Sequence, residues 1–512
     1  MYRCSRRSPA FFLALVFCVM AFFSCGTKRK LPPQVYTDHP KREFRAAWIQ
    51  TVYQSEYARL APAEVRRLLI GRLDKLKEAG CNAIIFQIRP ESDAWYESAI
   101  EPWSRFLTGR QGQAPTPLWD PLAFMVSECH KRGMELHAWI NPYRASTSGT
   151  AGLAPDHPYH RYPEWFVTYN NQLYYDPGVP DCRAYICRIV RDITMRYDVD
   201  AIHMDDYFYP YPLAGAAFPD GDSFRRYGQG YTSQTKGDWR RENVNKLVHE
   251  IKLTILQSKP WVRFGISPFG IYRNKRSSPS GSETAGLQNY DDLYADVLLW
   301  QKKGWIDYVI PQIYWEIGHK AADYATLAEW WGRNSVGATH LYFGQDVKRT
   351  MTARQLAPKM RMQRAVAAGH ALWPAGEVVN NTQGVADSLR SRYHRYPALI
   401  PAYTAMHRQA PPKVKGLHAA WLPSGFHLIW LAEKDESDPV KASYFVVYAF
   451  RHGVKKTTQH AENIWVITPE NSIRLPDSHA SADYTYWVTA VDRFHNESKP
   501  AKLKVKARYK RP

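Results

Sequence analysis

The chain has 512 residues, of which 45% are hydrophobic and 23% charged, proportions typical of a globular protein with more than one domain. Lysine and arginine outnumber aspartate and glutamate by 68 to 48, which gives a net charge of +20. The basic residues are dispersed, which argues against a nucleic-acid partner. This distribution favours an acidic polymer or anionic lipid as partner, or a basic surface without a role in function.

Segment 1–25 has the layout of an export signal, with three arginines ahead of an apolar run. The run FFLALVFCVMAFFSC is too short to span a bilayer comfortably, and the polar segment 26–43 follows it as a tether. Its end resembles the lipobox of bacterial lipoproteins, which implies lipidation at Cys25 and an anchor in the periplasm or outer membrane. Plain signal cleavage and a short anchor helix are the alternatives.

Four cysteines follow this segment, at positions 81, 129, 182 and 187. They are too few for a disulfide framework in a chain of this size, and no CxxC pair indicates a zinc site. We expect buried free thiols, although a bridge between Cys182 and Cys187 stays open.

Strand-like and helix-like segments alternate over residues 44–400. Eight strands, each separated from the next by a helix, are predicted in FRAAWIQT, CNAIIFQIRPES, ELHAWINPYR, VDAIHMDDYFYP, VRFGISPFGIYRN, WIDYVIPQIYWEIG, THLYFGQDV and GHALWPAGEV. Repeated βα units with continuous apolar strands predict a (β/α)8 TIM barrel. An open doubly wound sheet is the alternative, but no glycine-rich phosphate turn follows the first strand.

The character of the sequence changes near residue 400. Residues 401–412 are proline-rich and are expected to form a linker. Short alternating runs in 413–508 predict a small β-sandwich, whose end YTYWVTAVDRFHNESKPA resembles a fibronectin type III domain. We expect this domain to act in packing or positioning.

Polar side chains gather at the C-terminal ends of four predicted barrel strands. Because alternate residues point inward, the apolar Ile202 and Met204 on the outer face leave His203 and Asp205 inside. Asp206 lies past the strand end, and its direction stays open. The same alternation predicts inward positions for Gln87, Arg89, His137, Trp139, Asn141, Tyr207, Gln312, Tyr314 and Glu316.

These residues also have purely structural interpretations. Asp205 could be an ion-pair partner of Arg89, and His137 a satisfied core histidine. Such interpretations explain single residues better than the convergence of many polar groups at one mouth. Two long loops, 145–182 and 211–241, follow strands and are expected to wall a groove there.

Six segments together resemble glycosyl-hydrolase-like family 10, which comprises bacterial barrel lipoproteins and secreted proteins. They are FRAAWIQT, QIRPESDAWYESAIEPWS, LHAWINPYR, DAIHMDDYFYP, GISPFGIYRN and PQIYWEIGH. The resemblance implies a glycoside hydrolase without metal or cofactor that acts on an envelope glycan, namely peptidoglycan strands stripped of their peptides. The corresponding motif residues are Arg89, Asp93, His137, Asn141, Arg144, His203, Asp205, Asp206, Tyr207, Gln312, Tyr314 and Trp315.

Glycosidic cleavage needs one carboxylic acid and one carboxylate beside the sugar. We expect Asp205 to be the anionic group, with its charge favoured by His203 and by Arg89 or His137. Glu316, beside Trp315 but outside the family motif, is a candidate acid. Asp206 and Asp93 are its competitors, and the remaining motif residues are predicted to bind the glycan.

Two other functions remain open at this point. One is a metal-dependent hydrolase or deacetylase with His137, His203 and Asp205 as ligands, although the amides and tyrosines at the mouth suit hydroxyl recognition better. The other is a glycan-binding lipoprotein whose barrel lacks the catalytic acid. The oligomeric state is not predicted.

Overall fold

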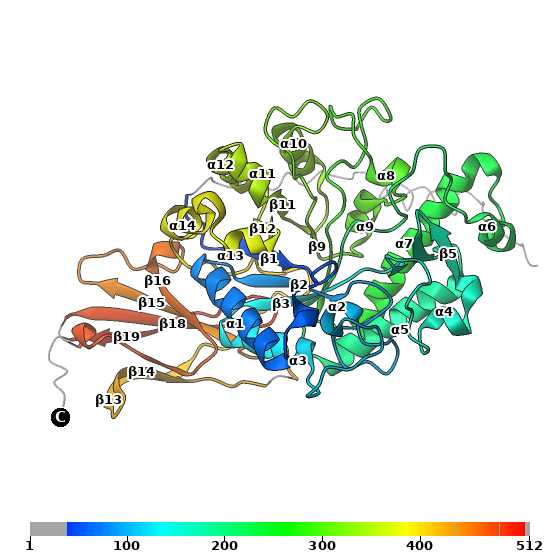
Figure 1. Ribbon diagram of the computed structural model, residues 1–512. Helices are drawn as coiled ribbons and strands as arrows, with labels where there is room; N and C mark the ends of the chain where they lie inside the picture. The colour runs from blue at the N-terminus through cyan, green and yellow to red at the C-terminus, as the bar shows by residue number, and fades with distance from the viewer. Residues whose placement is uncertain (1–37, 436, 481, 507–512) are drawn as a thin grey trace, which may run out of the picture. The chain divides into compact units, whose positions relative to one another are not determined.

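The computed structural model describes residues 38–435, 437–480 and 482–506, so the predicted signal segment and Cys25 lie outside the described residues. A parallel β-barrel surrounded by helices forms the larger part (Figure 1). Its strands are β1 (Phe44–Ile49), β2 (Ala83–Arg89), β3 (Glu135–Ile140), β7 (Ala201–Met204), β8 (Arg263–Ile266), β9 (Tyr308–Val309), β10 (His340–Leu341), β11 (Phe343–Asp346) and β12 (Gly369–Trp373).

The barrel closes because β10 and β11 are two parts of one strand, interrupted at Tyr342. β10 pairs with β9, whereas β11 pairs with β12, which in turn pairs with β1. The order β10-β9-β8-β7-β3-β2-β1-β12-β11 therefore corresponds to eight strands in a ring. This arrangement confirms the predicted (β/α)8 barrel.

One main helix follows each barrel strand and covers the outside of the ring. These helices are α1 (Pro62–Glu78), α3 (Pro121–Lys131), α5 (Pro180–Arg196), α7 (Lys236–Ser258), α9 (Val297–Lys303), α10 (Tyr324–Asn334), α12 (Leu356–Val366) and α13 (Ala375–Val379). In α1, Val65, Leu69, Leu73 and Leu76 are buried at the three- and four-residue spacing of an amphipathic helix. A separate apolar cluster, with Phe44, fills the inside of the barrel.

The two long loops fold as small elements on one side of the barrel. β4 (Arg144–Ser146), β5 (Phe166–Tyr169) and β6 (Gln172–Tyr175) form an antiparallel sheet, and the other loop carries α6 (Gly221–Tyr227). The hairpin turn uses Asn170 and Asn171, both at positive φ, as a two-residue turn requires. Tyr169 joins the loops, because its hydroxyl donates to Ala216 O at 3.0 Å and accepts from Leu213 N at 2.7 Å.

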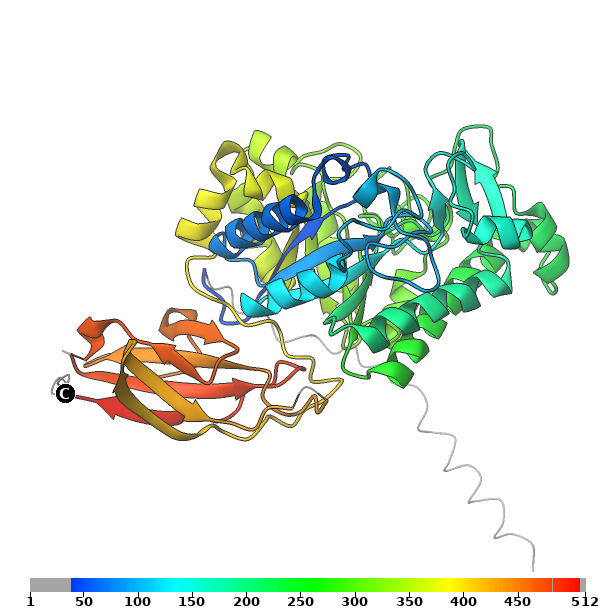
Figure 2. The same cartoon turned by 60° about the horizontal axis from the view of Figure 1, so that its bottom comes forward.

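The C-terminal part is the predicted small β-sandwich. One sheet contains β13 (Lys415–Leu422), β14 (Gly425–Leu431) and β17 (Ser472–Arg474). The other contains β16 (Ile464–Thr468), β15 (Tyr444–Arg451), β18 (Tyr484–Val491) and β19 (Ala501–Val505), and all pairs are antiparallel. Phe426, Trp430 and Phe445 belong to the core between the sheets. Both views place the sandwich on the side away from β5 and α6 (Figures 1 and 2).

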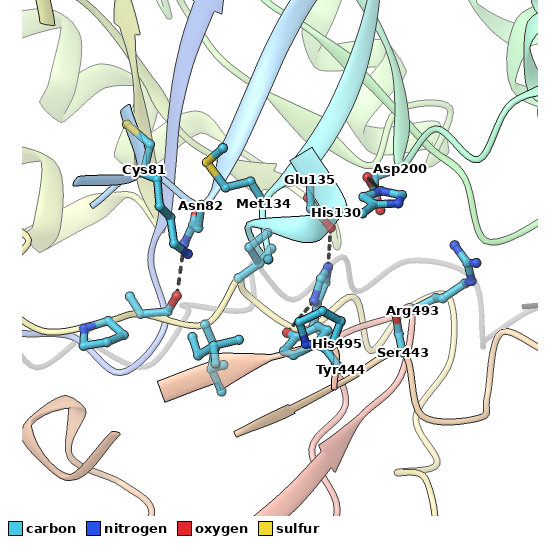
Figure 3. A pocket seen from close by; sticks show the side chains of 18 of the residues that line it. Cys81, Asn82, His130, Met134, Glu135, Asp200, Ser443, Tyr444, Arg493 and His495 are labelled. Carbon is cyan, nitrogen blue, oxygen red and sulfur yellow. Dashed lines mark hydrogen bonds and ion pairs between the residues drawn. The ribbon is translucent and has the colours of Figure 1, made fainter. Parts of the chain in front are cut away.

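The sandwich packs against the N-terminal end of the barrel. Arg493 binds Asp198, just before β7, at 2.8 and 3.1 Å, and His495 approaches Glu135 at the start of β3. A cavity of about 620 Å³ lies between the two parts and is lined by cationic and acidic side chains alike (Figure 3). This cavity is at the opposite end of the barrel from the strand ends that carry the predicted site.

The described cysteines are free thiols. Cys81, Cys129 and Cys182 are buried, and Cys187 is partly buried. The expectation of free thiols is confirmed for these four residues.

Candidate active site

Two adjacent carboxylates, Asp205 and Asp206, directly follow β7 and are almost fully buried. The Asp205 carboxylate accepts hydrogen bonds from Trp139 Nε1 at 3.1 Å and from the Tyr207 backbone N–H at 3.2 Å. The Asn141 side-chain amide lies 3.3 Å from the same carboxylate. Trp139 and Asn141 come from the end of β3, which pairs with β7, so the strand register brings these donors to Asp205.

The direction of Asp206, left open by the sequence, is toward β9. Gln312 Nε2 donates to Asp206 Oδ1 at 3.0 Å and to the Ser267 carbonyl at 2.8 Å. The Tyr211 hydroxyl donates to the other carboxylate oxygen. Two direct donors therefore favour a negative charge on Asp206.

Asp205 and Asp206 have different surroundings, which shift their pKa values to different extents. Burial raises the pKa of Asp205 to about 7, with a further contribution from the charge of Asp206 and an opposing one from Arg144. Burial also raises the pKa of Asp206, and the hydrogen bonds from Tyr211 and Gln312 oppose it. Two buried carboxylates that repel each other favour a state in which only one of them is charged. Near neutral pH the pair therefore contains one acid and one anion, with the proton favoured on Asp205.

Aromatic rings line one side of the pair. Arg144 lies 5.2 Å from the centre of the Tyr207 ring, which stacks on Tyr211 with centroids 5.4 Å apart. Tyr211 contacts Phe269 edge-on, and Phe269 contacts Trp315 in the same way. Flat amphipathic rings of this kind suit the apolar faces of sugars.

Three tryptophans form a second apolar group, which we call the tryptophan floor. Trp48 is the residue before the end of β1, Trp139 lies on β3 and Trp373 is the last residue of β12. Trp373 packs edge-on against both others, with centroids 6.4 and 6.2 Å apart. Sequence reasoning missed Trp48 and Trp373, although both have the inward position that strand alternation predicts.

Tyr314 lies within the same electrostatic environment. Burial raises its pKa well above the usual value, and the charges of Asp206, Asp346 and Asp205 add to the effect. Asp346, at the end of β11, was missed by the sequence analysis, as was Tyr211. Asp346 aligns with Trp373 in the strand register and also caps α11 (Val347–Thr352), because it accepts from Arg349 N at 2.8 Å. Strand alternation on FGQD could have identified it.

Glu316 is half-buried, and its charge affects the pKa of Lys359. The pKa of Lys359 is lowered to about 8 by burial, and the charges of Glu316 and Asp346 oppose this shift. Within the described part of the chain, no hydrogen bond or ion pair connects Glu316 to Asp205 or Asp206. Catalytic carboxyl groups of glycosidases lie about 5–9 Å apart and need no bond to each other, so Glu316 stays a candidate acid.

Three further predicted residues build loops beside the mouth. Arg89 makes a two-pronged ion pair with Glu101, at 2.6 and 2.7 Å, and not with Asp205. Gln87 Oε1 accepts from Thr51 N at 2.9 Å and so holds the loop after β1. Asp93 is fully buried, and its pKa is raised to about 7 by burial and then by the charge of Glu91.

The two predicted histidines lie below the carboxylates. His203 contacts Tyr308 and Ser267 at 3.1 and 3.0 Å, and His137 contacts Tyr308 and Glu135 at 2.7 and 3.0 Å. The charge of Arg144 is the one that opposes the raised pKa of Asp205. Among the described residues, no three His, Cys, Asp or Glu side chains are arranged to hold a metal ion, so the alternative ligand set is not assembled.

A closed parallel barrel with two carboxyl groups at its C-terminal strand ends contains the groups that glycosidic cleavage uses. Residues 43–361 match the family described as Glycosyl hydrolase-like 10, and the chain belongs to this family. Glycosyl hydrolase YngK of Bacillus subtilis (strain 168) is 40% identical over 486 residues, covering 91% of this chain and 94% of the relative. Glycosyl hydrolase DigH of Escherichia coli (strain K12) is 35% identical over 356 residues, covering 64% of this chain and 79% of that protein. The protein is a glycoside hydrolase.

Solved barrel structures resemble the chain at low sequence identity. The glycoside hydrolase domain of PgaB from Bordetella bronchiseptica has a TM-score of 0.42 and 11% identity, with 68% of this chain and 99% of that domain covered. The endo-β-1,4-mannanase from Thermotoga petrophila also has a TM-score of 0.42, with 8% identity and coverage of 91% and 97%.

The acidic limb of the pH–rate profile is expected to depend on Tyr211. Its hydroxyl stabilises the charged form of Asp206, so Tyr211→Phe removes a factor that lowers this pKa. If the reaction needs Asp206 ionised, the acidic limb of kcat/KM moves to higher pH in the variant. Tyr207→Phe keeps the backbone donor to Asp205 and serves as the control, whose acidic limb should stay in place. An unchanged limb in Tyr211→Phe would contradict this dependence.

Proposed function

We propose that the protein hydrolyses the glycan strands of peptidoglycan after their peptides have been removed. The observation that carries the proposal is the buried pair Asp205–Asp206, which contains an acid and an anion near neutral pH. Such a pair supplies both groups that glycosidic cleavage requires. Asp205 donates its proton to the leaving oxygen, ionised Asp206 stabilises the positive charge that develops on the sugar, and a water molecule forms the new bond to the sugar carbon. This assignment exchanges the roles that the sequence suggested for the two residues.

Three features support this substrate class. The family resemblance implies an envelope glycan, and the +20 charge suits a polymer with free lactyl carboxylates. Arg144 adds a buried cation beside the carboxylates, and the aromatic wall from Tyr207 to Trp315 offers faces for several sugar rings. Each of these features favours a long acidic glycan over a small neutral sugar.

The test is incubation of the protein with intact peptidoglycan, with peptide-stripped strands and with a neutral glucan, followed by mass analysis. We expect new reducing ends and short glycan fragments from stripped strands, with slower turnover at high salt. Equal turnover of neutral glucan would contradict the proposed substrate. Binding without new reducing ends would favour the glycan-binding alternative, and loss of activity with a chelator would favour the metal-dependent one.

We also propose that the protein is lipid-anchored through Cys25 to the bacterial envelope. The described residues contain no helix long and apolar enough to cross a membrane. Support comes from the N-terminal sequence, where the apolar run ends in FFSC. The wild-type protein should be recovered with membranes and carry acyl chains detectable by mass spectrometry, whereas Cys25→Ala should lose both. A Cys25→Ala protein that is as firmly bound as wild type would disprove the anchor.

A further inference from the structure

A continuous line of hydrogen bonds runs through the inside of the barrel, below the carboxylate pair. Trp48 Nε1 lies 3.3 Å from His203 Nε2, and His203 Nδ1 lies 3.1 Å from the Tyr308 hydroxyl. The same hydroxyl lies 2.7 Å from His137 Nδ1, and His137 Nε2 lies 3.0 Å from Glu135 Oε2. All five side chains are buried, and they come from β1, β7, β9 and β3.

The two ends of this line have fixed hydrogen-bonding roles. The indole of Trp48 can only donate, and an ionised Glu135 can only accept. Since Trp48 donates to Nε2 of His203, the proton of a neutral His203 must be on Nδ1 and point at the Tyr308 oxygen. The Tyr308 oxygen accepts this proton, and His137 Nε2 donates to the ionised Glu135. The proton positions on His203 Nδ1 and His137 Nε2 therefore follow from the two ends.

The charge states that this argument needs are those the surroundings favour. Burial, with a smaller contribution from the charge of His137, lowers the pKa of His203 well below its usual value, so its ring is neutral. The pKa of Glu135 is held well below its usual range, because Arg263 and His495 outweigh the effect of burial. Glu135 is therefore ionised.

The lower end of the line is fixed by both parts of the protein. Arg263 donates to Glu135 Oε1 at 2.5 Å, and its guanidinium lies 2.7 Å from His495 Nε2. His495 belongs to the loop after β18 of the sandwich, and its ring reaches Glu135 at the bottom of the barrel (Figure 3). Glu135 thus accepts from a side chain that the sandwich helps to hold.

The upper end of the line reaches the site. Trp48 is part of the tryptophan floor, in which Trp373 contacts both Trp48 and Trp139, the donor to Asp205. Ser267 contacts His203 Nε2 at 3.0 Å, and its carbonyl accepts from Gln312, the donor to Asp206. His203 Nε2 accepts hydrogen bonds from Trp48 and Ser267. The tautomer of His203 therefore orients Trp48 on the side of Asp205 and Ser267 on the side of Asp206.

We propose that Glu135, His137 and Tyr308 are positioning residues that hold His203 in the Nδ1–H tautomer and so keep the tryptophan floor and Ser267 in place for catalysis. The catalytic consequence rests on the proposed function, whereas the tautomer does not. A buried ring nitrogen of His203 that loses its hydrogen-bond partner would destabilise the positions of Trp48 and Ser267. The line is thus a fixed support for the site.

Nitrogen-15 spectra of histidine-labelled protein test the tautomer directly. We expect the His203 signal, assigned by its loss in His203→Gln, to show a proton on Nδ1 and a lone pair on Nε2. Tyr308→Phe keeps the ring and removes the hydroxyl that both histidines use, so the Nδ1–H of His203 loses its acceptor and the His203 signal should shift. With an active preparation, kcat should fall about tenfold or more with little change in KM.

Tyr342→Phe is the matched control for this variant. Tyr342 is equally buried in the same barrel interior, but its hydroxyl bonds to Tyr403 at 2.9 Å and lies off the line. Its removal should cost comparable stability and leave the His203 signal and kcat near wild type. A wild-type His203 with the proton on Nε2, or a Tyr308→Phe spectrum identical to wild type, would overturn the proposal. An equal loss of kcat in Tyr342→Phe would do the same. A protein without glycosidase activity would refute the proposed function and leave the spectroscopic result standing.

Discussion

Replacing Asp205 with asparagine should lower kcat on the glycan substrate by a factor of about 10²–10⁴, the usual contribution of a positioned acid or base. The amide keeps the shape of the carboxyl group, and its one oxygen can accept from either Trp139 or the Tyr207 N–H, which donate to different oxygens of Asp205. It cannot supply a proton to the leaving oxygen. Binding of the glycan, measured by calorimetry, should stay close to wild type.

The leaving group of the substrate distinguishes the roles of the two carboxylates. A good aryl leaving group needs little protonation, so an Asp205→Asn enzyme should recover much of its rate on such a glycoside. Asp206→Asn is the matched control, because an enzyme without the stabilising anion should stay slow on both substrates. If Asp206→Asn recovered on the aryl glycoside and Asp205→Asn stayed slow, Asp205 would be the stabilising anion. A fully active Asp205→Asn enzyme would show that Asp205 takes no part in the reaction.

The stability of Asp205→Asn should also differ from that of a protein with a broken ion pair. The folded-state pKa of about 7 lies above that of an unfolded aspartate, so ionised Asp205 destabilises the fold, most fully above pH 7. This penalty is lost as pH falls through 7 toward the unfolded pKa. At pH 8 the variant should therefore melt at or above the wild-type temperature, and the difference should shrink at pH 5. A much lower melting temperature at pH 8 would indicate a structural role.

The second large effect is expected at the ion pair between Arg89 and Glu101. Both side chains are fully buried, and Glu101 also accepts from the Ser92 hydroxyl at 2.7 Å. Glu101→Gln leaves the Arg89 charge buried without its anion, which should lower the free energy of unfolding by about 3–5 kcal/mol. Thermal and urea unfolding would measure the loss. The activity of the fraction that stays folded should change little, because this pair shapes the loop after β2.

The double variant Arg89→Gln with Glu101→Gln is the control for this prediction. It removes both charges, so it should regain a substantial part of the stability lost in Glu101→Gln alone. If Arg89 instead contacted the substrate, Glu101→Gln would keep its stability and weaken glycan binding. That outcome would support the substrate-binding role that the sequence suggested for Arg89.

Local patterns in the sequence were sufficient to predict the architecture. The eight apolar strands alternate with amphipathic helices, and this periodicity depends only on neighbouring residues, as Val65, Leu69, Leu73 and Leu76 of α1 illustrate. The sandwich follows from short alternating strands in the same way. Asp205 and Asp206 could be found because they follow an apolar strand, and in a parallel barrel all such strand ends meet at one mouth.

Tertiary structure alone decided which partner each polar residue meets. Strand alternation places His137, His203 and Asp205 inside the barrel, but it does not give their depth, and the two histidines lie below the mouth where they share Tyr308. The sequence allowed an ion pair between Arg89 and Asp205. In the structure the loop after β2 places Glu101 next to Arg89 instead. These partners are separated by 12 to 171 residues along the chain. Contacts over such separations depend on strand register and loop path, which are properties of the whole fold. The hydrogen-bond and ion-pair partners of these polar groups, and with them their charge states, therefore follow only from the tertiary structure.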